Sequence, residues 1–431
     1  MRRKRYARQL SAWGVPALYS GAAIVAGLTL PRIEGQFFPG LVTPMSISSG
    51  TAIFSSIASG MMALTGIVFS LTFVMVQFSA TAYSPRLVLL IARDPVMSHA
   101  LGIFTGTFLY AVAALAGIDR YGSGKVPFIS TWAVVALLLA SVAMFIALIY
   151  RVGLLQVNQM LIFTGDQGRR VIATLYPPMQ PAPAITERED FSTLPCTRTL
   201  THRGRPCTIQ SIDVSELVNL ARSADAVIEM AASVGDTVVE SMPLLHVFGP
   251  GEAIGERELR RRIELGSERT FAQDPKYAIR LLVDIAIRAL SPAVNDPTTA
   301  VQALDQIEDL LHRLGQRRLE VGDFRDRDGK LRLVVSFPAW DDLVRLAFDE
   351  ICFYGATSVQ VMRRMNALIS DLMLIVPATR RPALAYWGAR VKAVIARSFA
   401  SDEERIEAAK EDRQGLGAPR QNPGEARTAS A

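Results

Sequence analysis

The chain has 431 residues, of which 50% are hydrophobic and 20% are charged, and its formal net charge is +6. Residues 1–150 hold 10 Lys and Arg against 3 Asp and Glu, whereas residues 151–431 hold 36 against 37. Because the second part is neutral overall, the basic balance excludes the clustered positive face of a nucleic-acid-binding protein. Three scattered cysteines and four separated histidines lack metal-ligand spacing, so we expect no metal or cofactor.

Long uncharged stretches fill the first third of the chain. Residues 35–85 are 51 consecutive residues without Asp, Glu, Lys or Arg, and a spanning helix needs only about 20 apolar residues. The sequence predicts an α-helical membrane domain over residues 1–150, with four spans near 13–30, 49–79, 100–118 and 131–150. The second apolar segment, 47–83, would be about 55 Å long as one helix, so we expect it to protrude, tilt, or break near Gly60 or Gly66.

Positive charge predicts the orientation of the spans, because Lys and Arg beside a span stay on the cytoplasmic side. Five Lys and Arg residues precede the first span, Arg86 and Arg93 follow the second, and Arg151 closes the fourth. The opposite loops hold three basic residues between them, Arg32, Arg120 and Lys125. Both termini are therefore predicted to be cytoplasmic. A basic head before an apolar run also fits a cleaved signal peptide, which would remove the first span.

The remainder reads as a cytosolic α+β region. We expect a helical extension with a proline-rich linker over 151–190, a small β-rich, barrel-like subdomain over 191–252, a mainly helical subdomain with a β-hairpin over 253–400, and a disordered tail over 401–431. Residues 234–247 resemble the barrels of biotinyl and lipoyl carrier domains. No lysine lies between Lys125 and Lys276, so that resemblance implies the fold and not a carrier arm.

Short strands and capped helices are predicted within this region. Strands are expected at 197–201, 207–212, 226–231, 236–239 and 244–248, and a hairpin joins 319–324 to 331–337. Asp274-Pro275 and Asp296-Pro297 each place a side-chain acceptor before a residue without an amide hydrogen, which marks a helix start. Three further helices are expected at 341–354, 359–376 and 382–398.

Residues 269–300 contain the motifs Arg-Thr-Phe-Ala-Gln-Asp-Pro and Asn-Asp-Pro-Thr-Thr-Ala, and the second span contains Phe69-Ser70 before Tyr83-Ser-Pro-Arg86. With these motifs the chain resembles a bacterial family of predicted membrane proteins, catalogued as domain of unknown function 2254. The resemblance covers most of residues 10–380. It implies a bacterial inner-membrane protein with four spans and a cytosolic C-terminal region, and it brings no established activity.

A polar stripe along the second span is the first candidate site. Its residues recur every three or four positions, which keeps them on one helical face. The stripe favours helix packing or, in a homo-oligomer, the lining of a conduit for a small ion or solute. No charge lies inside a predicted span, which disfavours a proton-coupled pump. The stripe comprises Thr51, Ser55, Ser59, Met62, Gly66, Ser70, Phe73, Gln77, Thr81 and Ser84.

The second candidate site is a set of cytosolic polar residues around the two Asp-Pro helix starts. It either caps helices and closes turns or forms one pocket that binds an anion or small ligand. The set comprises Arg269, Thr270, Gln273, Asp274, Arg288, Ser291, Asn295, Asp296, Thr298 and Thr299.

Enzyme signatures are missing from the sequence, which has no phosphate loop, no Gly-x-Ser-x-Gly elbow and no His-Glu-x-x-His motif. The leading hypothesis is an oligomeric conduit in the lipid bilayer with a cytosolic assembly or gating region. The alternative is a membrane-anchored ligand sensor or scaffold without transport activity.

Overall fold

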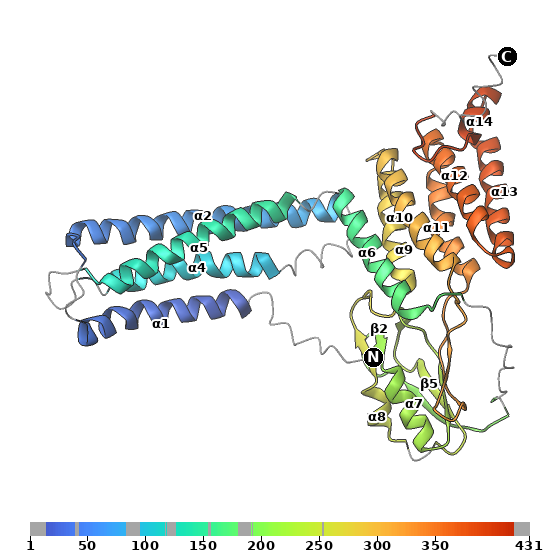
Figure 1. The fold of residues 1–431 in the computed structure, drawn as a ribbon, viewed down its shortest axis with the longest axis horizontal. Coiled ribbons are helices and arrows are strands. Elements are labelled where there is room, and N and C mark those ends of the chain that lie inside the picture. Colours follow the sequence, from blue (N-terminus) through green and yellow to red (C-terminus); the bar gives the residue numbers. More distant parts are fainter. Residues whose placement is uncertain are drawn as a thin grey trace. The chain divides into compact units, whose positions relative to one another are not determined.

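The computed structural model describes residues 14–38, 43–82, 95–116, 118, 126–153, 157–179, 191, 193–251 and 254–417. The chain divides into two compact units, residues 2–156 and residues 157–431 (Figure 1). The first is a bundle of long apolar helices, and the second combines two β-sheets with a set of shorter helices. This confirms the predicted fold class.

The first unit contains four helices long and apolar enough to cross a membrane. They are α1 (Gly14–Phe37), α2 (Ile47–Ala82), α4 (Pro95–Leu115) and α5 (Phe128–Gly153), and they confirm the four predicted spans. Helix α2 has 36 residues, so it is about 54 Å long. It is continuous through Gly60 and Gly66, so of the three expected alternatives the break does not occur, and protrusion or tilt remains.

Small residues bring α1 and α4 into close contact. A Cβ atom added to Gly27 of α1 would lie 2.7 Å from the Ala113 Cβ atom of α4, and one added to Gly102 of α4 would lie 2.9 Å from the Tyr19 ring. Near neighbours of this kind run in the same order along both helices, so α1 and α4 are parallel. Between α4 and α5, the Thr107 and Ser141 hydroxyls are hydrogen-bonded at 3.0 Å. Hydroxyl pairs and glycine contacts are typical of helices that pack in lipid.

A buried carboxylate joins α1 to α5. Helix α1 continues through Pro31, beyond the predicted end of the span at residue 30, and Glu34 in its last turn is only 4% exposed. The Glu34 carboxylate accepts hydrogen bonds from the amides of Phe128, Ile129 (3.0 Å) and Ser130 (3.4 Å). These amides begin α5, where a helix N-terminus favours negative charge. Glu34 lies beyond the predicted span 13–30, and α1 includes it because the helix continues past Pro31 and Arg32.

Two β-sheets form the first part of the second unit. Their strands pair antiparallel, except for one parallel pair, β3 with β8. The five-stranded sheet has the order β1-β5-β3-β8-β7 and the three-stranded sheet the order β4-β2-β6. Parallel pairing of β3 with β8 sets Ile228 opposite Leu333, so the predicted hairpin shares a sheet with the strands expected in the subdomain 191–252. The strands are β1 (Cys196–Thr201), β2 (Cys207–Ile212), β3 (Val227–Met230), β4 (Thr237–Val238), β5 (Pro243–Phe248), β6 (Ile263–Gly266), β7 (Asp323–Arg325) and β8 (Leu331–Val334).

Helices α7 (Val214–Ser223) and α8 (Glu256–Arg260) accompany the sheets. Leu217 of α7 and Leu259 of α8 are fully buried, in the same apolar core as Ile209, Ile228 and Leu245 of the strands. This core fixes α7 against the sheets.

The remaining helices pack mainly on one another. They are α6 (Val157–Leu175), α9 (Pro275–Ala289), α10 (Pro297–Gly315), α11 (Trp340–Tyr354), α12 (Val359–Ile375) and α13 (Arg381–Ser398). Asp274 and Asp296 cap α9 and α10 as predicted, with Asp274 accepting from the Lys276 and Tyr277 amides and Asp296 from the Thr299 amide. Helices α9 and α10 pack on each other, and both carry fully buried leucines such as Leu282 and Leu304.

The first part of the expected disordered tail is helical. Helix α14 (Asp402–Ala409) begins at Ser401, whose hydroxyl accepts from the Glu404 amide. The Asn366 amide of α12 donates to the Ala409 carbonyl at 3.3 Å, and Arg413 pairs with Asp371 at 2.7 Å. These contacts order residues that composition alone assigned to the tail. Residues 418–431 lie outside the described part of the chain.

Candidate functional site

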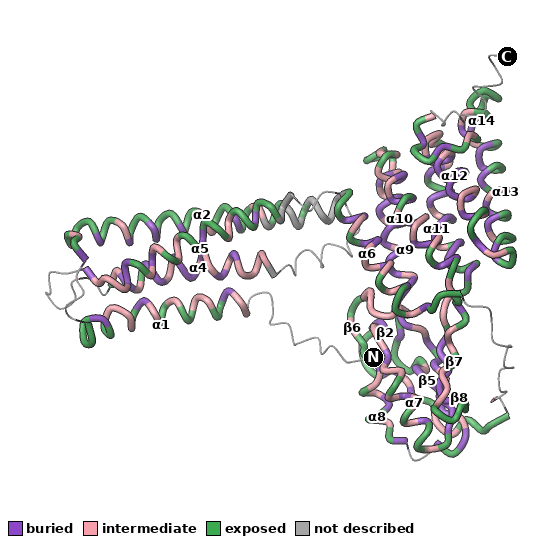
Figure 2. The backbone as a smooth tube through the Cα atoms, viewed as in Figure 1, coloured by how far each residue is buried: buried purple, intermediate pink, exposed green. Residues whose placement is uncertain are grey.

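The polar stripe of α2 lies on the face of the helix that turns away from its own bundle. All of its residues from Thr51 to Gln77 are exposed, Met62 and Phe73 each by 65% (Figure 2). On the opposite face, Phe54 and Val68 are completely buried, in the apolar clusters formed with α4 and α5. The Thr81 side chain and Ser84 lie outside what the structure describes.

The exposed face of α2 is open around its glycines, with no neighbouring atoms from the described part of the chain above them. A Cβ atom added to Gly60 or Gly66 would meet no atom within 4 Å. The Thr51 hydroxyl donates to the Ile47 carbonyl at 2.9 Å, which is the usual way for a threonine to satisfy its donor inside an apolar helix. A second helix could therefore approach this face closely near Ser55, Ser59 and Gly60, where the exposed side chains are small.

The second predicted set is divided by α9. Its first four residues precede the N-terminus of α9, and the other six lie beyond or at its C-terminus. Since α9 has 15 residues, its ends are about 22 Å apart. The structure therefore does not bring the ten residues into one pocket.

At the N-terminal end of α9, the polar groups satisfy one another. Arg269 donates to the Asp274 carboxylate at 2.6 Å and stacks on the Tyr277 ring at 5.4 Å. The Gln273 side chain forms two hydrogen bonds with the backbone of Ile212, at 2.9 and 3.0 Å. The Thr270 hydroxyl accepts from the Ala272 amide at 3.3 Å. These contacts join the start of α9 to strand β2.

Asp274 is the most buried charged group of this end, with 1% of its side chain exposed. Burial raises the pKa of the Asp274 carboxyl, and the neighbouring Arg269 opposes that rise. Close by, the Tyr176 hydroxyl is buried without a hydrogen-bond partner among the described residues. Burial and the Asp274 charge both raise the pKa of Tyr176. Gly235 adopts a φ of +91°, and a Cβ there would lie 2.2 Å from an Asp274 oxygen.

At the C-terminal end of α9, the polar groups shape the turn into α10. The Ser291 hydroxyl donates to the Arg288 carbonyl at 2.7 Å, and the Asn295 amide donates to the Ser291 carbonyl at 2.9 Å. Asn295 has a φ of +48°, which suits asparagine in a tight turn. The Asp296 carboxylate accepts from the Thr299 hydroxyl at 2.5 Å, and Thr298 is exposed.

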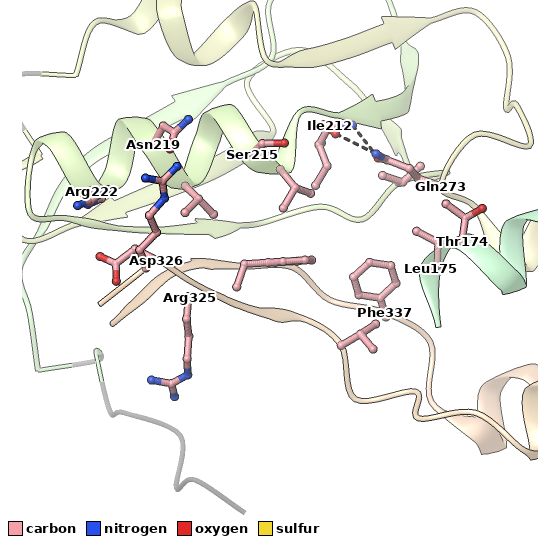
Figure 3. Close-up of a pocket in the computed structure, with 16 residues that line it drawn as sticks. Thr174, Leu175, Ile212, Ser215, Asn219, Arg222, Gln273, Arg325, Asp326 and Phe337 are labelled. Carbon is pink, nitrogen blue, oxygen red and sulfur yellow. Dashed lines mark hydrogen bonds between the residues drawn. The ribbon is translucent and has the colours of Figure 1, made fainter. Parts of the chain in front are cut away.

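A cavity of about 410 Å³, which sequence reasoning missed, lies beside α7. Its apolar wall includes Val214 and Val218 of α7, with Phe324 of β7 and Phe337 opposite. Figure 3 shows Ser215, Asn219 and Arg222 along α7, with Gln273 and the last residues of α6 at one end. Residues at i, i+4 and i+7 share one face of a helix, so this face of α7 presents three polar groups together.

The charged residues at the cavity differ in how far they are already engaged. The Asp326 carboxylate accepts from Arg332 at 2.7 Å and from the Asp328 and Lys330 amides at 3.0 Å. The Arg325 guanidinium donates to the Gly329 carbonyl at 2.8 Å and points away from α7 in Figure 3. Arg222 contacts the largely exposed Asp328 at 3.5 Å.

The cavity could not be predicted from a local sequence pattern, because its lining residues are spread along the chain from Thr174 to Phe337. Helix α7 and residues 324–327 supply several lining residues each, and the others come from α6, β2 and separate loops. Only the spacing of Ser215, Asn219 and Arg222, at i, i+4 and i+7, could have suggested a polar helical face. In the described part of the chain, no group of three His, Cys, Asp or Glu side chains could hold a metal ion.

Comparison with known proteins decides the family. The family model described as "Predicted membrane protein (DUF2254)" matches residues 9–371. The chain belongs to this family. An uncharacterised protein of Mycobacterium tuberculosis strain H37Rv is 26% identical over 411 residues, covering 92% of this chain and 78% of its own length, and a Mycobacterium bovis protein matches equally. No solved structure matched. As a member of the DUF2254 family with four apolar spans, this is a multi-pass membrane protein.

Proposed function

We propose that this DUF2254 protein is a homo-oligomeric conduit for ions or small solutes in a bacterial inner membrane, with both termini in the cytoplasm. The observation that carries the proposal is the orientation of the α2 stripe, which is exposed from Thr51 to Gln77 while the apolar face of the same helix is buried. Hydroxyl and amide groups on a surface otherwise suited to lipid favour contact with another helix or with water.

Two further features support this arrangement. Helix α2 has 36 residues against 21 to 26 in α1, α4 and α5, so it alone is long enough to extend well beyond a bilayer. The small side chains of Thr51, Ser55 and Ser59 allow close approach of a second copy along the first part of the stripe. The cytosolic unit would assemble or gate the oligomer. A membrane-anchored sensor is less favoured at the ends of α9, because the polar groups there cap helices and close turns.

Cysteine cross-linking tests the oligomer. In a Cys196→Ser background, which removes the exposed native thiol, Ser59→Cys should form a disulfide-linked dimer in native membranes. Leu139→Cys is the matched control, because Leu139 of α5 is 65% exposed but lies on a different helix. Equal cross-linking at both positions, or none at Ser59→Cys, would contradict the shared α2 face.

Planar-bilayer recording tests the conduit itself. The purified protein should conduct, and Ser70→Leu or Gln77→Leu should change its conductance, because each replaces a polar wall group with a bulky apolar one. Leu139→Ala should leave the conductance unchanged. Bilayers that stay silent across several salts would contradict the proposal.

A further inference from the structure

We propose that the cavity beside α7 binds a small amphipathic organic anion: a molecule with one flat apolar body and one negatively charged group. The cavity lies in the cytosolic unit, and its occupation is independent of whether α2 forms a conduit. Three observations carry the inference: the size of the cavity, the division of its wall into an apolar and a polar side, and the weakly compensated positive charge of Arg222 and Arg327.

The size of the cavity suits a small molecule. A volume of about 410 Å³ falls within the range of about 300–1,000 Å³ that is typical of ligand pockets. Ile212 and Val234 at its base are buried, so the floor is part of the protein core and is already formed without a ligand. The Gln273 side chain is fixed to the Ile212 backbone at one end. A rigid, preformed site reduces the entropy cost of binding.

The apolar side of the wall selects the body of the ligand. Val214 and Val218 form a ridge on α7, and the Phe324 and Phe337 side chains lie among the lining residues from the other elements. All four are partly buried and pack against the sheet core, so they are held in place while still bordering open space. A flat ring system would bury apolar surface against both valines and phenylalanines.

The charges at the rim select an anion. Asp326 is fully engaged by Arg332 and two backbone amides, so it does not neutralise the lining arginines. Arg327 is exposed and makes no ion pair with a described residue, and Arg222 has only a 3.5 Å contact to a carboxylate that is 66% exposed. Exposed pairs of that kind are weak, so Arg222 can turn to a ligand. The Ser215 hydroxyl and the Asn219 amide supply neutral hydrogen bonds beside it.

Calorimetric titration of the full-length protein in nanodiscs with naphthalene-1-sulfonate tests the inference, with empty nanodiscs as the blank. Binding should saturate, and the neutral analogue 1-naphthalenemethanol should bind at least about fivefold more weakly, because it lacks the charge-assisted hydrogen bonds. The double variant Arg222→Gln/Arg327→Gln should weaken sulfonate binding by about the same factor. Val218→Trp, which fills the cavity, should abolish binding of both compounds.

Arg203→Gln is the matched charge control, because Arg203 is 72% exposed and is not among the cavity-lining residues. It should leave binding within about twofold of the wild type, since a surface charge remote from the ligand is screened by salt. If Val218→Trp does not fold, as judged by its circular dichroism spectrum, Val218→Met and the arginine variants decide the question. Heat no larger than that of empty nanodiscs, or affinity unchanged in the cavity variants, would overturn the inference.

Discussion

Helices α1 and α4 in the membrane unit and helices α9 and α10 in the unit of residues 157–431 are both closely packed pairs, yet different residues stabilise them. Gly27, Gly102 and Ala113 line the first contact, whereas α9 and α10 carry fully buried leucines such as Leu282 and Leu304. In lipid, moving an apolar side chain from the acyl chains to a helix contact releases little free energy, because both environments are apolar. Close backbone approach and hydrogen bonds therefore stabilise the pair. In water, removing leucine from solvent supplies the free energy.

Buried polar groups differ in the same way. In the membrane unit, Glu34 is satisfied by backbone amides at the start of α5. In the unit of residues 157–431, the Arg364 side chain is 4% exposed and pairs with the Asp305 carboxylate at 2.8 Å and with Glu308. The first unit therefore depends on backbone geometry and the second on burial and on paired side chains. This contrast can be tested with single substitutions.

The largest effect is expected from Phe348→Ala in the helical core of the second unit. Phe348 of α11 is fully buried, with its ring 6.0 Å from the Trp387 ring. Truncation should lower the free energy of unfolding by about 3–5 kcal/mol, measured by urea denaturation with tryptophan fluorescence. Phe353→Ala on the same helix, where the side chain is 74% exposed, should change it by no more than about 0.5 kcal/mol. Similar losses in both variants would contradict the assignment of this core.

Glu34→Ala should have the next largest effect, within the membrane unit. It leaves the first amides of α5 without an acceptor, which should cost about 2–3 kcal/mol, measured by titration of dodecylmaltoside micelles with sodium dodecyl sulfate. Glu34→Gln retains an acceptor oxygen and should lose less than Glu34→Ala. If the two variants are equally destabilised, the negative charge matters more than the hydrogen bonds.

Gly27→Ala should destabilise the contact of α1 with α4 by about 1–3 kcal/mol, because the added methyl group overpacks it. That methyl group would lie 2.7 Å from the Ala113 Cβ atom and 2.9 Å from the Tyr110 carbonyl oxygen. Gly21→Ala on the same helix meets nothing within 4 Å, so the detergent titration should give a wild-type midpoint for it. A neutral Gly27→Ala would show that the two helices are farther apart.

The smallest effect concerns pH. Hydrogen bonding to Arg332 lowers the pKa of the Asp326 carboxyl from its ordinary value of 3.8. A lowered pKa stabilises the fold above pH 3.8, and this contribution is lost as the pH falls through the lowered pKa. Asp326→Asn removes it, so the urea midpoint of the variant should fall less steeply with acid than that of the wild type. Asp402→Asn, at a carboxylate that is 90% exposed, is the matched control, and parallel curves for wild type and Asp326→Asn would refute the linkage.

Local chemistry made much of the fold predictable from the sequence. Uncharged length located the four spans, and the Asp-Pro pairs located the starts of α9 and α10. Contacts between distant parts of the chain could not be predicted in this way. The partners of Glu34 are amides of α5, more than ninety positions away, and the parallel pairing of β3 with β8 joins residues that are more than a hundred positions apart.

The candidate sites show the same limit. The spacing of the α2 stripe predicted that its residues share a face, but the side to which that face turns depends on where α4 packs. Arg269 and Asn295 belong to neighbouring motifs in the sequence, and the length of α9 separates them. The cavity beside α7 combines residues of α7 with residues 324–327 and with side chains from other segments, and no short motif joins these distant parts of the chain.

The position of β8 in the five-stranded sheet has a consequence for synthesis on the ribosome. Strands β1, β5 and β3 can pair as soon as Phe248 has emerged, but the edge of β3 stays open until Leu333 has been translated. During that interval an unpaired strand edge invites association with other nascent chains. Pausing or truncation between these two points should therefore yield aggregates, whereas a chain released after β8 has a completed sheet.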